Sequence, residues 1–443
     1  MKVGVLGVGH VGLVTAVCMA SLGHDVVGMD DDVNKVHALQ NGVVPFYEPG
    51  LPALLADVVA ADRLVFTREA AEAIAGQDVV FVCVGTPRGK DGAPHLGFVE
   101  AAATSVATHA TGPLVVAEKS TVPVKTGERI AQWLERSGAV VGAHDVVSNP
   151  ELLREGTAIV DTLHPDRIVV GADSDRAHGV MRALYEPMLA SHDCPYVATD
   201  VRTAELIKHA SNAFLATKIS FINAIARICE LADADVQVLA DAMGMDPRIG
   251  RSFLNAGLGY GGSCFPKDVD AFIAIAGELG YDFGLLRETA RVNDDAKAWP
   301  LRQLKRMLDP VAGATVAVLG VAFKPGTDDV RDAPALDVIE GLRAAGATVR
   351  LHDPITLHAV RDRWTDVALC EDVEAALRGA DAVVVCTEWD EYADITPQRL
   401  RDLLTGTVVV DGRGVWDVDA LRAAGLNATT VGRAPQSPGR TAP

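Results

Sequence analysis

The chain has 443 residues, 49% of them hydrophobic and only 5% aromatic, which suits two or three domains with aliphatic cores. Its 59 acidic and 40 basic residues give a formal net charge of −19, and so acidic a surface argues against binding to nucleic acid or anionic membranes. No apolar run approaches about 20 residues, the N-terminus is typical of a strand rather than a signal peptide, and seven scattered cysteines favour a cytoplasmic location over a disulfide framework.

The first 30 residues have the pattern of a β-α-β unit. An apolar run over 2–6 predicts a buried strand, and a glycine-rich turn follows over 7–12. An apolar helix is expected over 13–22 and a second buried strand over 25–30, ending in an acid.

Three glycines in this turn have the spacing of a dinucleotide-binding loop. Gly7 suits the tight turn, Gly9 the approach of a pyrophosphate, and Gly12 the packing of helix on strand. The N-terminus of the helix offers N–H groups to the phosphates. Asp30 can accept a hydrogen bond from the ribose 2′-OH and repels a 2′-phosphate, which favours NAD over NADP. The alternative is a tight turn that binds no ligand.

Further strands alternate with helical stretches up to about residue 198. Buried apolar runs predict strands at 78–84, 114–119, 146–147 and 167–170. Alternation of this kind is typical of a doubly wound parallel sheet, so residues 1–198 are expected to form an NAD-binding Rossmann-like α/β domain.

From residue 199 the hydrophobic period becomes helical. Apolar residues recur at helical spacing from Leu206 to Ile225, which predicts a long helix at the start of an all-helical domain over 199–308. The apolar stripe of this helix suits either a dimer interface or burial against the chain's own domains.

The strand pattern returns after residue 308 and predicts a second Rossmann-like domain over 309–432. Its strands are expected at 314–320, 348–353, 382–386 and 408–411. Because the turn at 320–326 lacks the glycine spacing of the first domain, this domain is expected to bind something other than a dinucleotide. Residues 433–443 have no apolar period and are expected to form a disordered tail.

The segment 259–268 reads Gly-Tyr-Gly-Gly-Ser-Cys-Phe-Pro-Lys-Asp and places Cys264 among glycines, which allow a backbone to approach a ligand closely. A thiolate can trap the aldehyde formed when NAD oxidises an alcohol. A second oxidation then gives a thioester, which water hydrolyses to an acid. The alternative is a small residue in a tight loop, with no chemical role.

Segment 259–268 resembles the active-site signature of the UDP-glucose/GDP-mannose dehydrogenase family, whose members oxidise a nucleotide sugar twice to a uronate. Nearly the whole chain takes part in the resemblance. Other similar segments follow in the family's order at 119–123, 148–158, 164–168, 208–212, 320–331 and 411–413.

The resemblance implies an NAD-dependent four-electron oxidation of UDP-glucose to UDP-glucuronate by a homodimer or higher homo-oligomer. The segment Phe323-Lys-Pro325 is closer to the UDP-glucose enzymes, because GDP-mannose enzymes tend to have alanine after the lysine. GDP-mannose or another nucleotide sugar remains the alternative substrate. Further alternatives are a two-electron hydroxy-acid dehydrogenase and a non-enzymatic NAD sensor.

The resemblance also implies catalytic roles. Cys264 would be the nucleophile, Asp268 would help proton transfer and water activation, and Glu151 would act as a general base or through a water. Lys208 and Asn212, four apart on one helix face, would hold the reacting oxygen, with Lys208 stabilising the oxyanion.

Two ligand-binding sets follow from the same resemblance, and each charged member has the alternative of an ordinary solvated or ion-paired surface group. The cofactor set is Gly7, Gly9, Val11, Gly12, Asp30, Lys35, Thr86, Thr121, Glu155, Lys267 and Arg331. Thr121 and Glu155 are expected where cofactor and reaction centre meet, and Thr121 is also expected to be catalytic. The substrate set is Glu151, Leu152, Leu153, Arg154, Glu155, Lys208, Asn212, Arg248, Phe253, Leu254, Asn255, Ala256, Gly257, Gly261, Lys324 and Arg413.

Within these sets, Arg248 matches an arginine that reaches across a dimer in the family. Leu152 and Tyr260 stand where the family often has phenylalanine, a departure that affects packing rather than mechanism. We assign no metal ligands.

Overall fold

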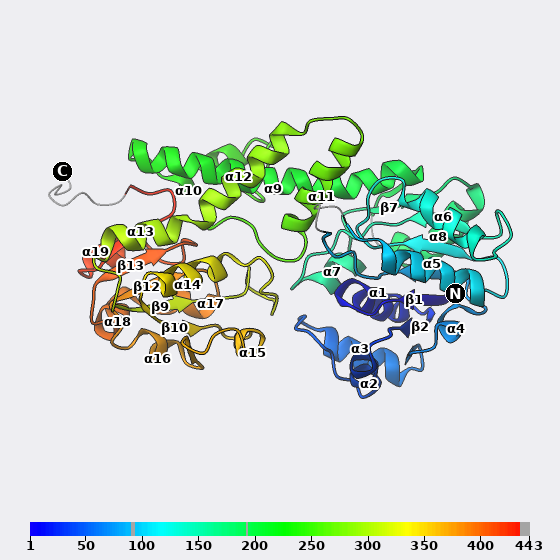
Figure 1. Ribbon diagram of the computed structural model, residues 1–443, viewed down its shortest axis with the longest axis horizontal. Coiled ribbons are helices and arrows are strands. Elements are labelled where there is room, and N and C mark those ends of the chain that lie inside the picture. Colours follow the sequence, from blue (N-terminus) through cyan, green and yellow to red (C-terminus); the bar gives the residue numbers. More distant parts are fainter. Residues whose placement is uncertain (90–93, 192–193, 435–443) are drawn as a thin grey trace. The chain divides into compact units, whose positions relative to one another are not determined.

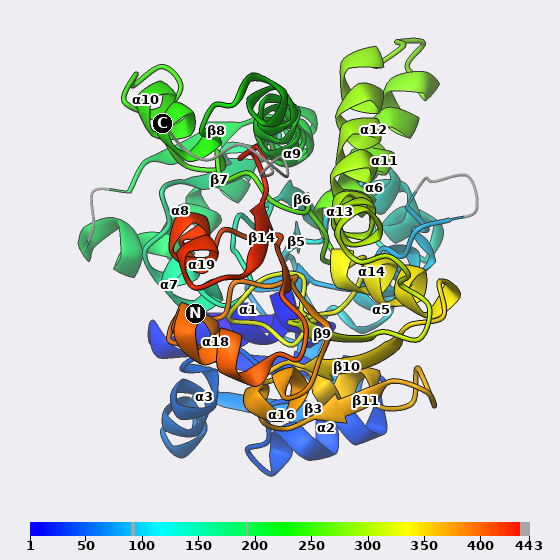
Figure 2. The ribbon, with the colours of Figure 1, turned by 90° about the vertical axis from the view of Figure 1, so that its left-hand side faces the viewer.

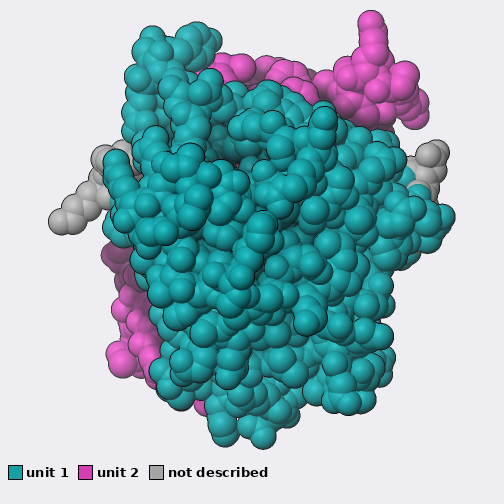
Figure 3. Space-filling model, turned by 90° about the vertical axis from the view of Figure 1, so that its right-hand side faces the viewer, with its two compact units in different colours: residues 1–211, 270–281 teal, residues 212–269, 282–443 magenta. Residues whose placement is uncertain are grey.

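The computed structural model describes residues 1–89, 94–191 and 194–434 (Figure 1). The chain forms two compact units, the first from residues 1–211 and 270–281 and the second from 212–269 and the rest of the chain after residue 281 (Figure 3). The helical central segment is present as predicted, and its helices are divided between the two units.

The first unit is built on an eight-stranded sheet of order β3-β2-β1-β4-β5-β6-β7-β8. Its strands are β1 (Lys2–Leu6), β2 (Asp25–Met29), β3 (Leu64–Thr67), β4 (Val79–Val82), β5 (Val115–Glu118), β6 (Asp145–Ser148), β7 (Ile168–Gly171) and β8 (Tyr196–Thr199). Neighbouring strands are parallel except β6 and β7, which meet antiparallel at Ser148 and Gly171. The predicted doubly wound sheet is confirmed with this one antiparallel joint, and β3 and β8 were not predicted.

Helices cover both faces of this sheet, which explains why β1, β4 and β5 are almost continuous apolar runs. One buried cluster contains α1, whose residues Gly12 to Ala20 are all buried, and another lies under α5 and α6. The helices are α1 (His10–Ser21), α2 (Val33–Gln40), α3 (Leu51–Ala60), α4 (Ala70–Ile74), α5 (Gly97–His109), α6 (Thr126–Arg136), α7 (Ala158–Leu163) and α8 (Asp175–Ser191).

The strand order reverses beside β1, since β2 pairs with one edge of β1 and β4 with the other. In open α/β sheets, ligands bind outside the carboxyl ends of the strands at such a switch point. The glycine turn after β1 and the loop after β4 both leave the sheet here.

Helix α9 (Val201–Ala232) has 32 residues and runs from the first unit into the second (Figure 1). The predicted long helix is therefore confirmed, and it ends before α10 (Val236–Gly244), whose first turn is capped by the Asp235 carboxylate. The remaining helices of the central segment are α11 (Phe265–Glu278), α12 (Gly284–Lys297) and α13 (Trp299–Met307). No helix in the described ranges is long and apolar enough to cross a membrane.

The second unit contains a six-stranded, wholly parallel sheet of order β11-β10-β9-β12-β13-β14, part of which is labelled in Figure 2. Its strands are β9 (Thr315–Leu319), β10 (Thr348–His352), β11 (Ala368–Cys370), β12 (Ala382–Val385), β13 (Val408–Asp411) and β14 (Asn427–Thr430). Its helices are α14 (Pro334–Ala344), α15 (Leu357–Val360), α16 (Val373–Leu377), α17 (Asp390–Ala393), α18 (Pro397–Leu403) and α19 (Val418–Ala423). Two buried clusters cover the two faces, as expected for a second Rossmann-like domain; β11 and β14 were not predicted.

The disordered tail was predicted to begin at residue 433, which is too early. Arg433 forms ion pairs with Asp235 and, at 2.7 Å, with Asp419, while the carbonyl of Ala434 accepts from the Arg422 guanidinium at 3.1 Å. The acids at the starts of α10 and α19 attract Arg433, so residues 433 and 434 are held in place. The rest of the predicted tail lies outside the described residues.

The glycine turn yields a test of packing alone. A Cβ at Gly12 would lie 1.8 Å from the Gly7 carbonyl oxygen, whereas a Cβ at Gly9 would meet no atom within 4 Å. We predict that Gly12→Ala lowers the thermal midpoint Tm by about 3 °C or more, since about 1 kcal/mol shifts Tm by ~2–4 °C in domains of this size. Gly9→Ala is the matched control and should leave Tm unchanged; equal Tm values for the two variants, measured by calorimetry, would contradict this packing.

Candidate active site

The glycine turn forms an open cradle at the N-terminus of α1. Gly7 has φ of +87°, and its N–H donates to the Met29 carbonyl at 2.8 Å. Gly12 packs on the Gly7 carbonyl, and a Cβ at Gly9 would meet no atom within 4 Å. The three residues therefore fit a bound pyrophosphate in the way that their spacing predicts. Val11 lies in the first turn of the same helix.

Asp30 follows β2 and is almost fully buried. Its carboxylate accepts from the N–H groups of Val8 and Asp32 at 3.0 and 3.1 Å and from the Lys35 ammonium at 2.8 Å. These bonds fix the Asp30 carboxylate beside the glycine turn. In the loop after β4, the Thr86 hydroxyl donates to the Thr121 carbonyl at 3.0 Å.

Glu151 and Lys208 form a buried ion pair. The Lys208 Nζ lies 2.6 Å from Glu151 Oε1, and each side chain is 6% exposed. The second carboxylate oxygen accepts from the Leu153 N–H at 3.0 Å. Glu151 comes from the loop after β6 and Lys208 from α9, so the fold joins two groups that lie 57 positions apart.

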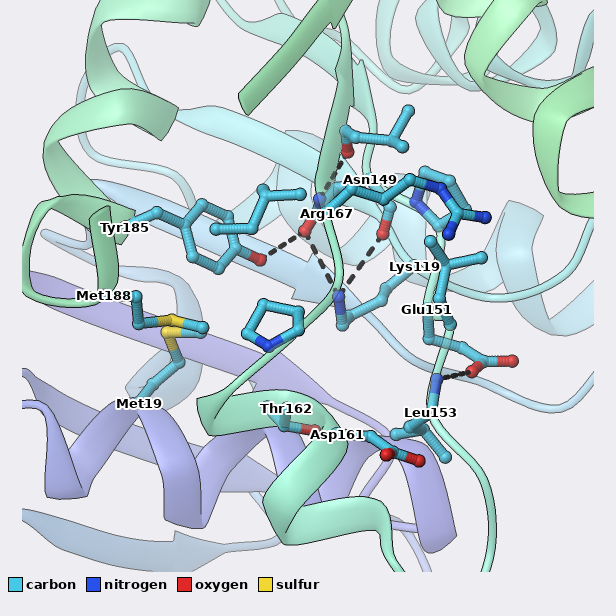
Figure 4. Close-up of a pocket in the computed structure, with 15 residues that line it drawn as sticks. Met19, Lys119, Asn149, Glu151, Leu153, Asp161, Thr162, Arg167, Tyr185 and Met188 are labelled. Carbon is cyan, nitrogen blue, oxygen red and sulfur yellow. Dashed lines mark hydrogen bonds between the residues drawn. The ribbon is translucent and has the colours of Figure 1, made fainter. Parts of the chain in front are cut away.

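A second buried network lies behind Glu151 and lines a pocket in the first unit (Figure 4). The side-chain oxygen of Asn149 accepts from Lys119 at 3.2 Å and from the Tyr185 hydroxyl at 2.6 Å, while its amide donates to the Val169 carbonyl at 2.8 Å. Burial lowers the pKa of Lys119. In the sequence, Lys119 and Asn149 fall within the similar segments 119–123 and 148–158. Tyr185 was not predicted, since a single tyrosine in an amphipathic helix carries no signal.

The loop after Glu151 is anchored by a carboxylate that sequence reasoning also missed. Glu48, 2% exposed, accepts from the N–H groups of Gly156 and Ala158, both at 2.8 Å, and contacts the His10 ring at 3.0 Å. The exposed Arg154 instead binds Asp161, at 2.6 and 2.9 Å. Leu152, Leu153 and Glu155 are half-buried in the same loop.

In the second unit, Cys264 immediately precedes α11, and its carbonyl accepts from the Asp268 N–H at 2.8 Å. The cysteine is exposed. Asp268 is 2% exposed and accepts from the Asn212 amide at 2.6 Å, and its other oxygen lies 2.9 Å from the Lys267 ammonium. The structure thus brings Asn212 and Asp268 together, and it gives Lys267 a carboxylate partner.

The glycines before Cys264 have a structural explanation. A Cβ at Gly259 would lie 2.4 Å from the Asn293 side chain, one at Gly261 would lie 2.3 Å from the Asp332 carbonyl, and one at Gly262 would lie 2.8 Å from the Phe323 ring. Gly259 and Gly262 also have positive φ. The loop therefore needs these glycines to pack on its own unit, whatever ligand it binds.

Arg413 is held beside the segment 253–257. Its guanidinium donates to the carbonyls of Cys386 and Phe323, at 2.8 and 3.3 Å, and would lie 3.2 Å from a Cβ at Gly257. Lys324 lies over the Phe323 ring at 5.6 Å. The preceding Asp411 accepts from three backbone N–H groups, and burial raises its pKa to about 6. The members of the segment are Phe253, Leu254, Asn255, Ala256 and Gly257.

Two predicted site arginines lie on exposed loops. Arg248 and Arg331 are 87% and 64% exposed in their side chains, and each forms a bidentate ion pair with an aspartate two residues earlier, Asp246 or Asp329.

The described residues contain no group of three or more histidine, cysteine or acidic side chains arranged for a metal ion. None of the seven cysteines, all of which lie in described segments, forms a disulfide.

The Lys208–Glu151 pair gives a prediction about stability. Lys208→Met leaves the Glu151 carboxylate buried without its cation and should lower the free energy of unfolding by about 3–5 kcal/mol. The exposed pair of Arg63 and Asp25 is the control, and Arg63→Met should cost less than about 1 kcal/mol. Urea unfolding of both variants measures the difference, and equal losses would contradict the burial of the pair.

Comparison with known proteins gives three consecutive family matches. Residues 1–189 match the NAD binding domain of the UDP-glucose/GDP-mannose dehydrogenase family, residues 202–295 its central domain, and residues 317–418 its UDP binding domain. The glycine cradle and Asp30 lie in the first of these, and Lys208, Asn212 and Cys264 in the second.

Individual relatives match over nearly their whole length. A UDP-glucose 6-dehydrogenase of Rhizobium meliloti is 44% identical over 98% of this chain and 100% of its own, and one of Bacillus subtilis is 43% identical over 98% and 93%. The solved structure of a UDP-glucose dehydrogenase from Pyrobaculum islandicum is 39% identical, with a TM-score of 0.90 over 98% of both chains. This chain therefore belongs to the UDP-glucose/GDP-mannose dehydrogenase family.

Proposed function

We propose that this protein oxidises UDP-glucose to UDP-glucuronate in two NAD-dependent steps, through a thioester on Cys264. The observation that carries the proposal is the exposed Cys264 at the start of α11, one turn before a buried Asp268 that Asn212 holds at 2.6 Å. A two-electron alcohol dehydrogenase has no use for a thiol nucleophile. A non-enzymatic NAD sensor has no use for the buried proton-transfer groups.

Binding of the cofactor is assigned to the first unit. NAD, when bound, accepts a hydride in each oxidation. The cradle at Gly9 and the N-terminus of α1 receive the pyrophosphate, and Asp30 accepts from the ribose hydroxyl. The fixed charge of Asp30 repels a 2′-phosphate, which favours NAD over NADP. Lys35, Thr86, Thr121 and Glu155 complete the proposed contacts, together with Lys267 and Arg331 from the second unit.

The first oxidation needs a base for the proton of the sugar 6-hydroxyl. Glu151, held in its pair with Lys208, accepts this proton directly or through a water. Lys208 stabilises the negative charge that develops on the oxygen as the carbon loses its hydride. The product of this step is the 6-aldehyde.

The second oxidation uses the thiolate of Cys264, which the partial positive charge at the N-terminus of α11 favours. A C–S bond forms at the aldehyde carbon, and the carbonyl electron pair moves to an oxygen held by Lys208 and Asn212. Loss of a second hydride gives the thioester. Water then attacks, Asp268 takes its proton, the C–S bond breaks, and the acid and the thiol are released.

The substrate assignment rests on the second unit and on the relatives. Arg413, Lys324 and the segment 253–257 meet on one surface there, and this surface is proposed to hold the nucleotide sugar, with Arg248 as a further contact. The two relatives at 43% and 44% identity are UDP-glucose 6-dehydrogenases, which favours glucose over mannose and uridine over guanosine.

We also propose that the protein is at least a homodimer. Phe214, Phe221 and Ile228 recur every seven residues along α9, with exposures of 67%, 47% and 59%. Apolar side chains at this spacing form one stripe on a helix, and an exposed stripe of this kind marks a protein interface.

The thioester route can be tested with Cys264→Ser supplied with UDP-glucose. A serine hydroxyl is a far weaker nucleophile at neutral pH, so formation of UDP-glucuronate should fall by at least about a thousandfold. Quenched-flow chromatography of the sugar products measures this, and Cys370→Ser, a partly buried thiol on β11, is the control. Undiminished formation of UDP-glucuronate by Cys264→Ser would contradict the thioester route.

The proposed dimer can be tested at the exposed apolar stripe of α9, formed by Phe214, Phe221 and Ile228. Phe221→Glu introduces a charge into the proposed interface and should convert the protein to monomers, as measured by sedimentation velocity. Val65→Glu is the control, because Val65 is also exposed but lies on β3 of the first unit. A wild-type protein that sediments as a monomer at micromolar concentration would refute the dimer.

A further inference from the structure

We propose that Glu205 and His209 of α9 are positioning residues that hold the loop between β5 and α6, and with it Thr121, in the geometry needed for hydride transfer. The catalytic consequence rests on the proposed function. The hold itself is a property of the first unit, to which all of these residues belong.

Glu205 caps α6 from a distance. Its two carboxylate oxygens accept from the N–H groups of Lys125, at 2.6 Å, and Gly127, at 2.8 Å. The first turn of a helix has N–H groups without partners in the helix, and a nearby serine, threonine or aspartate normally caps them. Here the N-cap residue is Lys125, whose side chain makes no capping bond, so a carboxylate from another helix takes that place.

The contacts of Glu205 with this loop require a buried carboxylate and a strained backbone, which indicates a functional role. Glu205 is only 3% exposed, and burial raises its pKa to about 7, against the opposing effect of its backbone hydrogen bonds. Lys125 has φ of +74°, a left-handed conformation that is strained for a residue other than glycine. Such conformations persist where the surroundings fix them, and they cluster at functional sites.

His209 holds the same loop at a second point. Its Nε2 lies 2.7 Å from the Val122 carbonyl oxygen and its side chain is buried. Because a carbonyl only accepts, Nε2 carries the proton. The ring also stacks on Phe272, with 5.5 Å between the ring centroids. Glu205 and His209 are one helical turn apart, so a single face of α9 makes hydrogen bonds to the loop on both sides of Pro123.

Thr121 directly precedes Val122, the residue whose carbonyl His209 binds. Its carbonyl accepts from Thr86, so the backbone is fixed on one side by the loop after β4 and on the other by α9. Lys208, between the two holding residues in sequence, reaches Glu151 from the same turn of α9. One rigid helical turn therefore sets the position of the Thr121 loop relative to the base, an arrangement suited to a geometry that must be held within fractions of an ångström.

The chain offers a matched control on the same two helices. Arg202 of α9 and Glu128 of α6 form an ion pair at 2.5 Å, but their side chains are 60% and 44% exposed. If a link between α9 and α6 were enough, loss of this pair would have the same effect as loss of Glu205. We expect Arg202→Gln to behave as wild type.

Hydrogen–deuterium exchange of the apo protein tests the hold directly. In Glu205→Gln one carboxylate oxygen becomes an NH₂ that faces an N–H donor, so amides in the peptide 122–128 should exchange about tenfold faster, as for the loss of ~1.4 kcal/mol of protection. His209→Leu should have the same effect. His209→Gln keeps a donor for the Val122 carbonyl and should restore protection.

Steady-state kinetics with UDP-glucose and NAD test the consequence. For Glu205→Gln and His209→Leu we expect kcat to fall by about 10- to 100-fold, since a displacement near 1 Å at a reaction centre can cost 10²-fold. The KM for UDP-glucose should stay within about twofold, because the holding residues do not contact the substrate surface. His209→Gln should recover most of kcat.

Wild-type exchange in both Glu205→Gln and His209→Leu would overturn the hold, as would a fall in kcat without faster exchange. If wild-type protein reduces no NAD with any nucleotide sugar, the proposed function fails, yet faster exchange in both variants would still support the hold. If Glu205→Gln does not fold, the contrast between His209→Leu and His209→Gln decides, and equal behaviour of those two would overturn it.

Discussion

The ion pair between Lys208 and Glu151 is the constraint on which the chemistry proposed for the first unit depends. Two full charges removed from water are tolerated only when they meet at hydrogen-bond distance with their remaining valences satisfied. The 2.6 Å separation and the Leu153 N–H meet that requirement. These contacts orient the carboxylate of Glu151, the proposed base, before any substrate binds. In the second unit the same principle applies to Asp268, which is buried between Asn212 and Lys267.

Helix α9 is the element that makes this arrangement possible. Within two helical turns, in the part of α9 that belongs to the first unit, the helix supplies three buried polar side chains, Glu205, Lys208 and His209. They bond to Gly127, Glu151 and Val122 respectively. A helix sets the spacing of such groups more strictly than a loop does, because each residue is fixed by its backbone hydrogen bonds. The exposed apolar stripe further along α9 adds a surface suited to a second subunit. Catalysis and assembly are thus proposed to share one helix.

Much of the fold could be predicted from sequence because buried parallel strands are apolar runs that glycine turns separate. The strands that were missed are short and partly exposed at sheet edges, as β8 and β11 show, so their apolar signal is weak. Motifs located Cys264 and Asp30 but not the pairing of Lys208 with Glu151, which joins residues 57 positions apart. Glu48 and Glu205 gave no signal, since a lone acid in sequence is indistinguishable from a solvated one. The glycines around Cys264 needed coordinates to show that they pack on their own unit.

The central claim is that one nucleotide sugar is oxidised twice on the same protein. Its most direct test is the amount of NADH formed when limiting UDP-glucose is consumed to completion by wild-type protein with excess NAD, with the sugar product identified by mass spectrometry. We predict two NADH per UDP-glucose and UDP-glucuronate as the product, with no comparable reaction of GDP-mannose. One NADH per sugar, an aldehyde as final product, or activity with GDP-mannose alone would contradict it.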